Sequence, residues 1–66
     1  MMIKSIIRLQ NDMVMVFDEK GEQVPEYQGQ YEAVKKSIVK KAPPDAVFAC
    51  WFEYAMEAEV ISRENW

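Results

Sequence analysis

The sequence predicts an α+β fold, a small, mainly antiparallel sheet with one helix packed on one face, in the order ββ(β)αββ. Three features indicate it: two alternating apolar runs around a turn, one run with helical periodicity, and one uncharged run rich in aromatic and β-branched residues. These features lie at residues 3–10 and 13–18, 30–42, and 46–52. Because the chain has 66 residues, we expect a single domain over residues 1–66.

The first two runs read as a β-hairpin around Asn11 and Asp12, which tolerate the positive φ of a two-residue turn. This register would place Ile7 opposite Val16, and it sorts the side chains onto two faces. The face expected to meet the helix holds Ile3, Ser5, Ile7, Leu9, Val14 and Val16. The opposite face holds Lys4, Ile6, Arg8, Gln10, Met13, Met15 and Phe17. A slip of one residue would exchange the faces, so the assignment depends on the turn.

The middle of the chain predicts a turn at residues 18–21, a short third strand at 23–25 and a helix at 30–42. On that helix an apolar stripe suited to packing on a sheet is formed by Tyr31, Val34, Ile38 and Ala42. Pro43 and Pro44 end the helix, because neither can donate a backbone hydrogen bond.

The C-terminal third begins with the apolar run 46–52, which is expected to be a central strand covered on both faces. We expect residues 58–62 to return as a last strand, because so apolar a strand needs neighbours on both sides. Residues 53–59 also have high helix propensity, and a helix there is the alternative. Residues 63–66 are expected to form a polar tail that ends in Trp66.

Composition argues against several kinds of chemistry. The chain has no histidine, so it lacks the commonest general base and metal ligand, and its single cysteine cannot form an internal disulfide. Cys50 stands among apolar neighbours, which do not favour a reactive thiolate. The glutamates of the chain lack the spacing of a cation-binding loop. We therefore predict a protein that is not an enzyme and uses no cofactor and no metal.

The same composition bears on location and partners. A net charge of −3 is not the basic footprint of a nucleic-acid binder, and Lys35, Lys36, Lys40 and Lys41 read as a solvated helix face. No apolar run is long enough to span a bilayer and no signal peptide is evident. We expect a cytoplasmic protein that binds neither nucleic acid nor membrane.

Four runs of the sequence resemble those of short uncharacterised bacterial proteins. They are residues 6–10, Met13–Asp18, residues 24–29 and residues 62–66. The resemblance implies a stand-alone bacterial cytoplasmic protein and carries no activity or site.

The feature that points to function is a surplus of apolar residues. One short helix can cover only one face of a sheet, and an uncovered apolar face usually marks a protein interface. We predict an interface of Ile6, Met15, Phe17 and Trp51 that binds a second copy of the chain, as a homodimer, or another protein. The alternative is a sheet that curls and covers its own far face. A second hypothesis is a small-ligand module lined by Tyr27, Tyr31 and Trp51.

Overall fold

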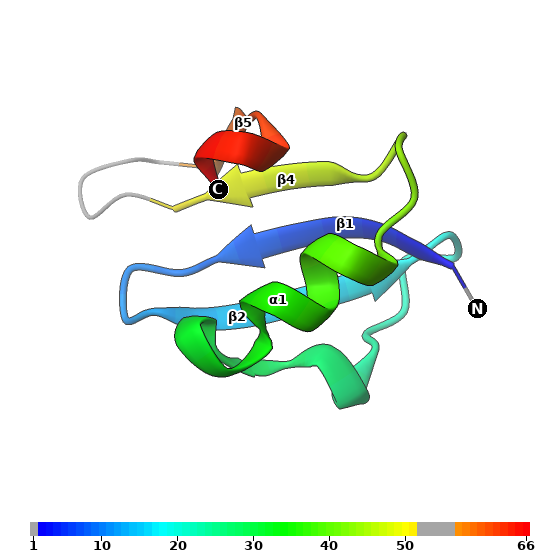
Figure 1. The fold of residues 1–66 in the computed structure, drawn as a ribbon, viewed down its shortest axis with the longest axis horizontal. Coiled ribbons are helices and arrows are strands. Elements are labelled where there is room, and N and C mark those ends of the chain that lie inside the picture. Colours follow the sequence, from blue (N-terminus) through cyan, green and yellow to red (C-terminus); the bar gives the residue numbers. More distant parts are fainter. Residues whose placement is uncertain (1, 52–56) are drawn as a thin grey trace.

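A computed structural model describes residues 2–51 and 57–66 as an α+β fold with one α-helix and a five-stranded mixed sheet (Figure 1). The strand order across the sheet is β3-β2-β1-β4-β5. The elements are β1 (Ile3–Arg8), β2 (Met13–Asp18), the 3₁₀ turn η1 (Pro25–Tyr27), β3 (Gly29–Gln30), α1 (Tyr31–Lys41), β4 (Val47–Cys50), β5 (Glu59–Ile61) and the 3₁₀ turn η2 (Arg63–Asn65). The predicted fold class is confirmed, but the sheet is not wholly antiparallel.

The β1–β2 hairpin is present, but its register differs by one residue from the predicted one. Ile6 pairs with Val16 and Ile7 pairs with Met15. Val14 and Val16 face the helix as predicted, whereas on β1 it is Ile6 and not Ile7 that joins them. Ile3 still reaches the core because a register shift between residues 3 and 5 marks a β-bulge.

The register changed because the hairpin loop has three residues, 10–12, rather than two. The Leu9 carbonyl accepts a 2.9 Å hydrogen bond from the Asp12 N–H, and Asp12 takes the left-handed conformation at φ 63°. Asp12 also accepts from the Arg8 guanidinium at 2.8 Å, and its carbonyl accepts from the Tyr31 N–H at 2.8 Å. The turn is thus stabilised partly by contact with the start of α1.

The prediction of a third strand at residues 23–25 is wrong, because the third strand lies further along the chain. Gln23 forms only an isolated bridge with Phe17, and Pro25 instead begins η1, where its missing N–H costs no hydrogen bond. The third strand is β3, which pairs with β2 through Gly29 opposite Val14. Gly29 has φ 149°, a conformation that L side chains rarely adopt, so glycine suits this junction into α1.

Helix α1 confirms the predicted apolar stripe. Ile38 is fully buried, Ala42 is 6 % exposed, and Tyr31 and Val34 pack against the core. The helix lies across one face of the sheet, over β1 and β2 (Figure 1). Ile38 belongs to one hydrophobic core cluster with residues of that face, among them Ile3, Ile6, Val14, Val16 and Phe48.

Strand β4 pairs with β1 in parallel, which corrects the expectation of an antiparallel neighbour. The crossover through α1 carries the chain over β1, so β4 runs alongside β1 in the same direction. Ile6 and Phe48 pair across this junction and both face the helix. The run is central, between β1 and β5, but it is not covered on both faces, since Val47 is 40 % exposed.

The predicted last strand is confirmed in part. β5 pairs antiparallel with β4, with Val60 opposite Ala49. The strand is shorter than the predicted 58–62. Phe52 at the end of the predicted fourth strand, and residues 53–56 of the alternative helix, lie outside the described residues.

The predicted polar tail is wrong, because the end of the chain belongs to the core. Trp66 is 2 % exposed, its indole Nε1–H donates to the Ala49 carbonyl at 2.9 Å, and its ring meets those of Tyr31 and Phe48 edge-on at 5.1 Å. The Arg63 guanidinium donates to the carbonyls of Val39 and Ala42, each at 3.1 Å, and also to that of Pro43. Arg63 thereby satisfies carbonyls at the end of α1 that have no partner within the helix.

Candidate interaction surface

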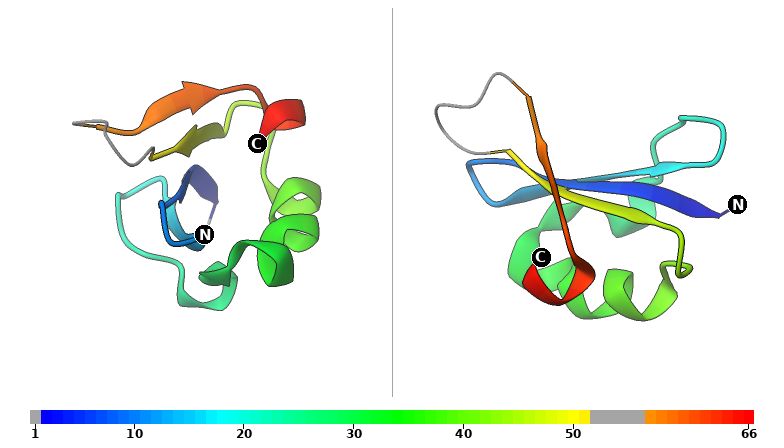
Figure 2. Two further views of the ribbon diagram at one scale, coloured as in Figure 1. Left: turned by 90° about the vertical axis from the view of Figure 1, so that its left-hand side faces the viewer. Right: turned by 90° about the horizontal axis from the view of Figure 1, so that it is seen from above.

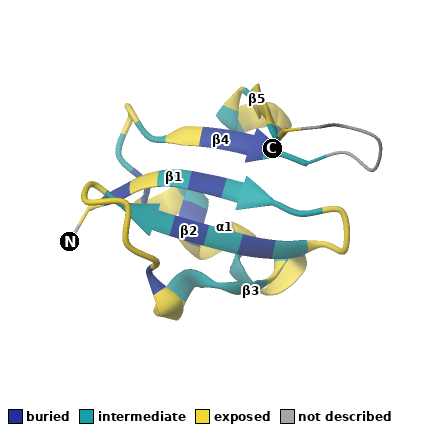
Figure 3. Cartoon of the chain, turned by 180° about the vertical axis from the view of Figure 1, so that it is seen from behind, coloured by how far each residue is buried: buried dark blue, intermediate teal, exposed yellow. Residues whose placement is uncertain are grey.

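Within residues 2–51 and 57–66, no helix lies over one face of the sheet. In Figure 2 α1 and the two 3₁₀ turns lie on the same side of the sheet, and Figure 3 looks directly onto the other side. Because residues paired across neighbouring strands share a face, the register defines the members of this side. We call it the uncovered face, and it consists of Ser5, Ile7, Met13, Met15, Phe17, Val47, Ala49 and Val60, with the polar Gln30 of β3 beside Met13 at its edge.

The uncovered face is apolar and carries no charged residue among these eight positions. Val60 is 72 % exposed and Val47 is 40 % exposed, whereas Ala49 between them is only 6 % exposed. The remaining members are partly buried, as expected of side chains that shade one another on a pleated surface. Lys4 lies in the β-bulge beside the face and pairs with Asp45 at 3.1 Å. The eight positions thus form a mainly apolar surface, with the ion pair of Lys4 and Asp45 beside it.

The structure places two of the four residues of the predicted interface on the uncovered face. Met15 and Phe17 lie on the uncovered face, as predicted. Ile6 does not, because it is fully buried beneath α1, and Ile7 takes its place. Sequence reasoning also missed Val47 and Val60, which alternation along their strands could have identified once a register was known.

Trp51, the fourth predicted interface residue, follows the end of β4. Its backbone N–H donates to the Arg8 carbonyl at 2.8 Å, continuing the parallel ladder. Its partly buried side chain borders an open cleft of about 620 Å³ at the ends of β1 and β4. The other residues that line this cleft are Arg8, Leu9, Gln10, Asn11, Asp12 and Cys50.

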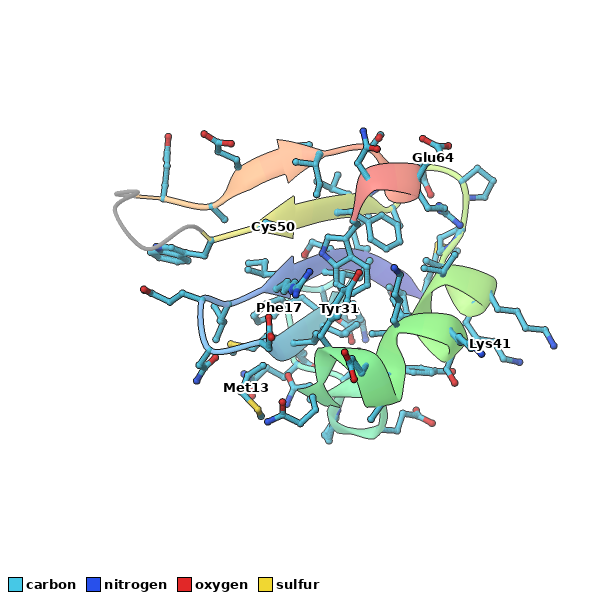
Figure 4. The ribbon with its side chains drawn as sticks, turned by 60° about the vertical axis from the view of Figure 1, so that its left-hand side comes forward. Met13, Phe17, Tyr31, Lys41, Cys50 and Glu64 are labelled. Carbon is cyan, nitrogen blue, oxygen red and sulfur yellow. The ribbon has the colours of Figure 1, made fainter. Side chains whose placement is uncertain are left out.

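The chemistry of the cleft is dominated by Arg8, whose guanidinium already has partners. Its Nε and Nη2 donate to Asp12 at 3.0 and 2.8 Å, and its Cζ lies 3.6 Å from the centre of the Tyr31 ring. Figure 4 shows Tyr31 reaching from α1 toward the C-terminal segment, where its hydroxyl donates to the main-chain oxygen of Trp66. Of the three aromatics predicted to line a ligand site, only Trp51 borders this cleft, while Tyr27 and Tyr31 pack against the core.

Cys50 is the single thiol of the chain, and its surroundings favour the protonated form. Burial raises the pKa of Cys50, and this effect outweighs the nearby positive charge of Arg8, which acts in the opposite direction. Because thiolate is the reactive species, a raised pKa makes Cys50 a poor nucleophile near neutral pH.

Alkylation measures this environment directly. At neutral pH we expect iodoacetamide to modify Cys50 more slowly in the folded chain than in urea, with the rate in the folded state rising only above the ordinary pKa range of a thiol. The raised pKa also makes the free energy of unfolding depend on pH, because the unfolded chain loses its thiol proton at a lower pH than the folded chain. The stabilisation that Cys50 contributes is therefore fully present below the pKa of the unfolded chain, and it declines as pH rises through the pKa of the folded chain. Equal alkylation rates in the folded and unfolded chain would contradict a raised pKa.

Two further properties concern only the described residues. Within 2–51 and 57–66, no three histidine, cysteine, aspartate or glutamate side chains are grouped so that they could hold a metal ion. No α-helix in the same part of the chain has the length and apolar character needed to cross a bilayer.

Comparisons with known proteins identify no relative. No protein-family model, no curated protein and no solved structure matches this chain.

Proposed function

We propose that this chain is a small, non-enzymatic interaction protein whose working surface is the uncovered face. The observation that carries the proposal is a sheet with its helix on one side and eight uncharged, mainly apolar positions on the other (Figure 3). Contiguous apolar surfaces of this kind mark sites of protein association. A cytoplasmic location, and the absence of nucleic-acid or membrane partners, are part of the same proposal.

The edges of the sheet support the use of the face rather than an edge. The outermost strands are β3, with two residues, and β5, with three. Such short edge strands offer few unpaired backbone groups to an incoming strand, a common means of preventing edge-to-edge pairing. An association driven by side chains on the uncovered face is therefore favoured over extension of the sheet.

Site-specific photo-crosslinking in the native host tests the proposal. A photoreactive phenylalanine analogue placed at Met15 should give covalent adducts with another polypeptide, because Met15 lies on the uncovered face. The matched control is the same analogue at Ser37, an exposed position on α1, from which we expect no adduct. Adducts that are absent at position 15, or equally strong at position 37, would refute the proposed surface.

A second candidate is the small-ligand role predicted for Tyr27, Tyr31 and Trp51. The cleft that Trp51 borders with Arg8 favours it, because pockets commonly combine an aromatic surface with a few polar groups. Tyr31 supports this cleft indirectly, since its ring lies against the Arg8 guanidinium. A thermal-shift screen of small metabolites in which no compound raises the melting temperature would argue against this role.

A further inference from the structure

We infer that the cleft at the ends of β1 and β4 binds a neutral, planar heterocycle in which a carbonyl stands next to a ring N–H, as in a pyrimidine base. Arg8 donates a hydrogen bond to the carbonyl of the ligand, Asp12 accepts one from its N–H, and Trp51 forms an aromatic wall of the site. The inference rests on the small-ligand role, the second candidate function, and names the chemical class of the ligand.

The cleft lies where the topology of the sheet favours a ligand site. Strands β1 and β4 are parallel neighbours whose ends lie side by side, and their arrowheads point the same way in Figure 1. The strands that follow them along the chain, β2 and β5, lie on opposite sides of this pair. In open α/β sheets the same arrangement creates the crevice in which ligands bind, outside the carboxyl ends of the strands. The cleft volume of about 620 Å³ is also within the range of small-molecule sites.

Arg8 lines this cleft with a guanidinium that is already held in place. Its Cζ lies 3.6 Å from the centre of the Tyr31 ring, and the Tyr31 hydroxyl donates in turn to the main-chain oxygen of Trp66. Its Nε and Nη2 donate to one oxygen of Asp12, Oδ1, at 3.0 and 2.8 Å. The Nη1 group has no hydrogen-bond partner within residues 2–51 and 57–66. Arg8 can therefore donate to a ligand without first being ordered, which favours binding.

Asp12 determines which ligand charge the cleft favours. Its carboxylate balances the guanidinium of Arg8 at 2.8 Å, so the pair has no net charge. An anion attracted by Arg8 would be repelled by Asp12 and by a chain of net charge −3, and a cation attracted by Asp12 would be repelled by Arg8. The second carboxylate oxygen, Oδ2, accepts no hydrogen bond from the part of the chain that the structure describes. The ion pair thus offers a neutral ligand one donor group and one acceptor.

A ring with a carbonyl next to an N–H matches this pair, because its two adjacent polar atoms need one donor and one acceptor. A planar ring also suits the opposite wall of the cleft. Trp51 lines it from the end of β4, whereas Arg8 and Asp12 line it from the β1–β2 hairpin. A ring placed between the two walls contacts both, and heteroaromatic rings of this kind stack readily on indole.

Titration of the isotope-labelled native chain with uracil, followed by NMR, tests the inference. Uracil should shift the backbone amides of residues 9–12 and the indole N–H of Trp51 in a saturable way. The indole N–H of Trp66 should not shift, because it is buried and bonded to the Ala49 carbonyl. So small a ring has few atoms with which to bind, so we expect a Kd on the order of 1 mM.

Two further compounds test the polar recognition on the same native chain. Dimethyluracil with both ring nitrogens methylated keeps the ring and its carbonyls but has no N–H, and benzoate is a planar anion of similar size. Each should bind at least about tenfold more weakly than uracil, because the first cannot donate to Asp12 and the second is repelled by it. Uracil that shifts none of these resonances, or either compound binding as tightly as uracil, would overturn the inference.

Asp12→Asn tests the role of the carboxylate. Asparagine tolerates the left-handed conformation at this position, φ 63°, so the hairpin turn should be kept. Uracil should bind this variant at least about tenfold more weakly, whereas benzoate should bind it more tightly than it binds the native chain, because Arg8 is no longer neutralised. Asp45→Asn makes the same change at an acid paired with Lys4, outside the cleft, and should leave both affinities unchanged. Unchanged uracil binding by Asp12→Asn would contradict the assigned role.

The outcomes for the ligand class and for the proposed functions are separable. If another compound shifts residues 9–12 and uracil does not, the ligand class is wrong and the small-ligand role stands. If no compound of the thermal-shift screen shifts these residues, both are refuted. Crosslinking from position 15 reports on the uncovered face and does not depend on either result.

Discussion

Replacing Ile6 with alanine should lower the free energy of unfolding by about 2–5 kcal/mol, whereas the same change at Ile7 should cost less than about 1.5 kcal/mol. Ile6 is fully buried between α1 and the sheet and pairs with Val16 and Phe48, so its truncation leaves a cavity in the core. Ile7 is only partly buried on the uncovered face, where solvent can fill the space that the side chain leaves.

The two isoleucines form a matched pair. They are neighbours on the same strand and undergo the same chemical change, so the loss of β-propensity is similar in both variants and cancels in the comparison. Urea unfolding followed by circular dichroism gives both values, at a protein concentration low enough for the chain to be monomeric. The two-residue turn predicted from sequence would bury Ile7 instead, so a larger loss at Ile7 than at Ile6 would show that the three-residue loop is wrong.

Replacing Trp66 with alanine should have the largest effect on stability, a loss of about 3–5 kcal/mol. Its indole fills the space between α1 and β4, meets Tyr31 and Phe48 edge-on at 5.1 Å, and donates to the Ala49 carbonyl at 2.9 Å. A chain of this size has a total stability on the order of 3–10 kcal/mol, so the variant should be largely unfolded or barely folded at 37 °C.

Trp66→Phe separates the packing of the ring from its hydrogen bond. Phenylalanine keeps most of the apolar contact but leaves the Ala49 carbonyl without its donor, so we expect a smaller loss of about 1–3 kcal/mol. Thermal and urea unfolding of the native chain, Trp66→Phe and Trp66→Ala should rank the three in that order. A Trp66→Ala variant as stable as the native chain would contradict the placement of this residue in the core.

The C-terminal segment, residues 62–66, also stabilises the end of α1 through Arg63. Its guanidinium donates to Val39 and Ala42 carbonyls at the end of α1, and its Cζ lies 5.0 Å from the centre of the Phe48 ring. Residues 62–66 therefore connect the end of α1 to β4, which explains how so short a helix is held on the sheet. The polar composition of residues 62–66 concealed this role, because Arg63 donates hydrogen bonds to part-buried carbonyls while Trp66 alone supplies the apolar bulk.

The existence of an apolar sheet face without a helix over it could be predicted from the sequence, but the residues that lie on it could not all be predicted. An apolar excess over what one helix can cover is a property of composition and pattern, and it indicated an uncovered face before any register was known. Met15 and Phe17 lie on the side of the sheet predicted for them because β2 keeps its predicted faces. Ile6 was assigned wrongly because a loop of three residues instead of two reverses the faces of β1 alone.

Sequence alone was sufficient to predict the elements whose cause is local. The apolar stripe and the two prolines after it are enough to place a helix that the structure finds at Tyr31–Lys41, and β-branched and aromatic composition places β1, β2 and β4. How these elements pack together depends on contacts that appear only in the folded chain. The left-handed turn at Asp12 is stabilised by the hydrogen bond from the Tyr31 N–H, and β4 pairs with β1 in parallel after a helical crossover. Trp66 packs in the core and donates to the carbonyl of Ala49, 17 residues before it in the sequence. Each of these depends on contacts between distant residues, whose free energies are of similar size to local preferences and are not expressed in any short stretch of sequence.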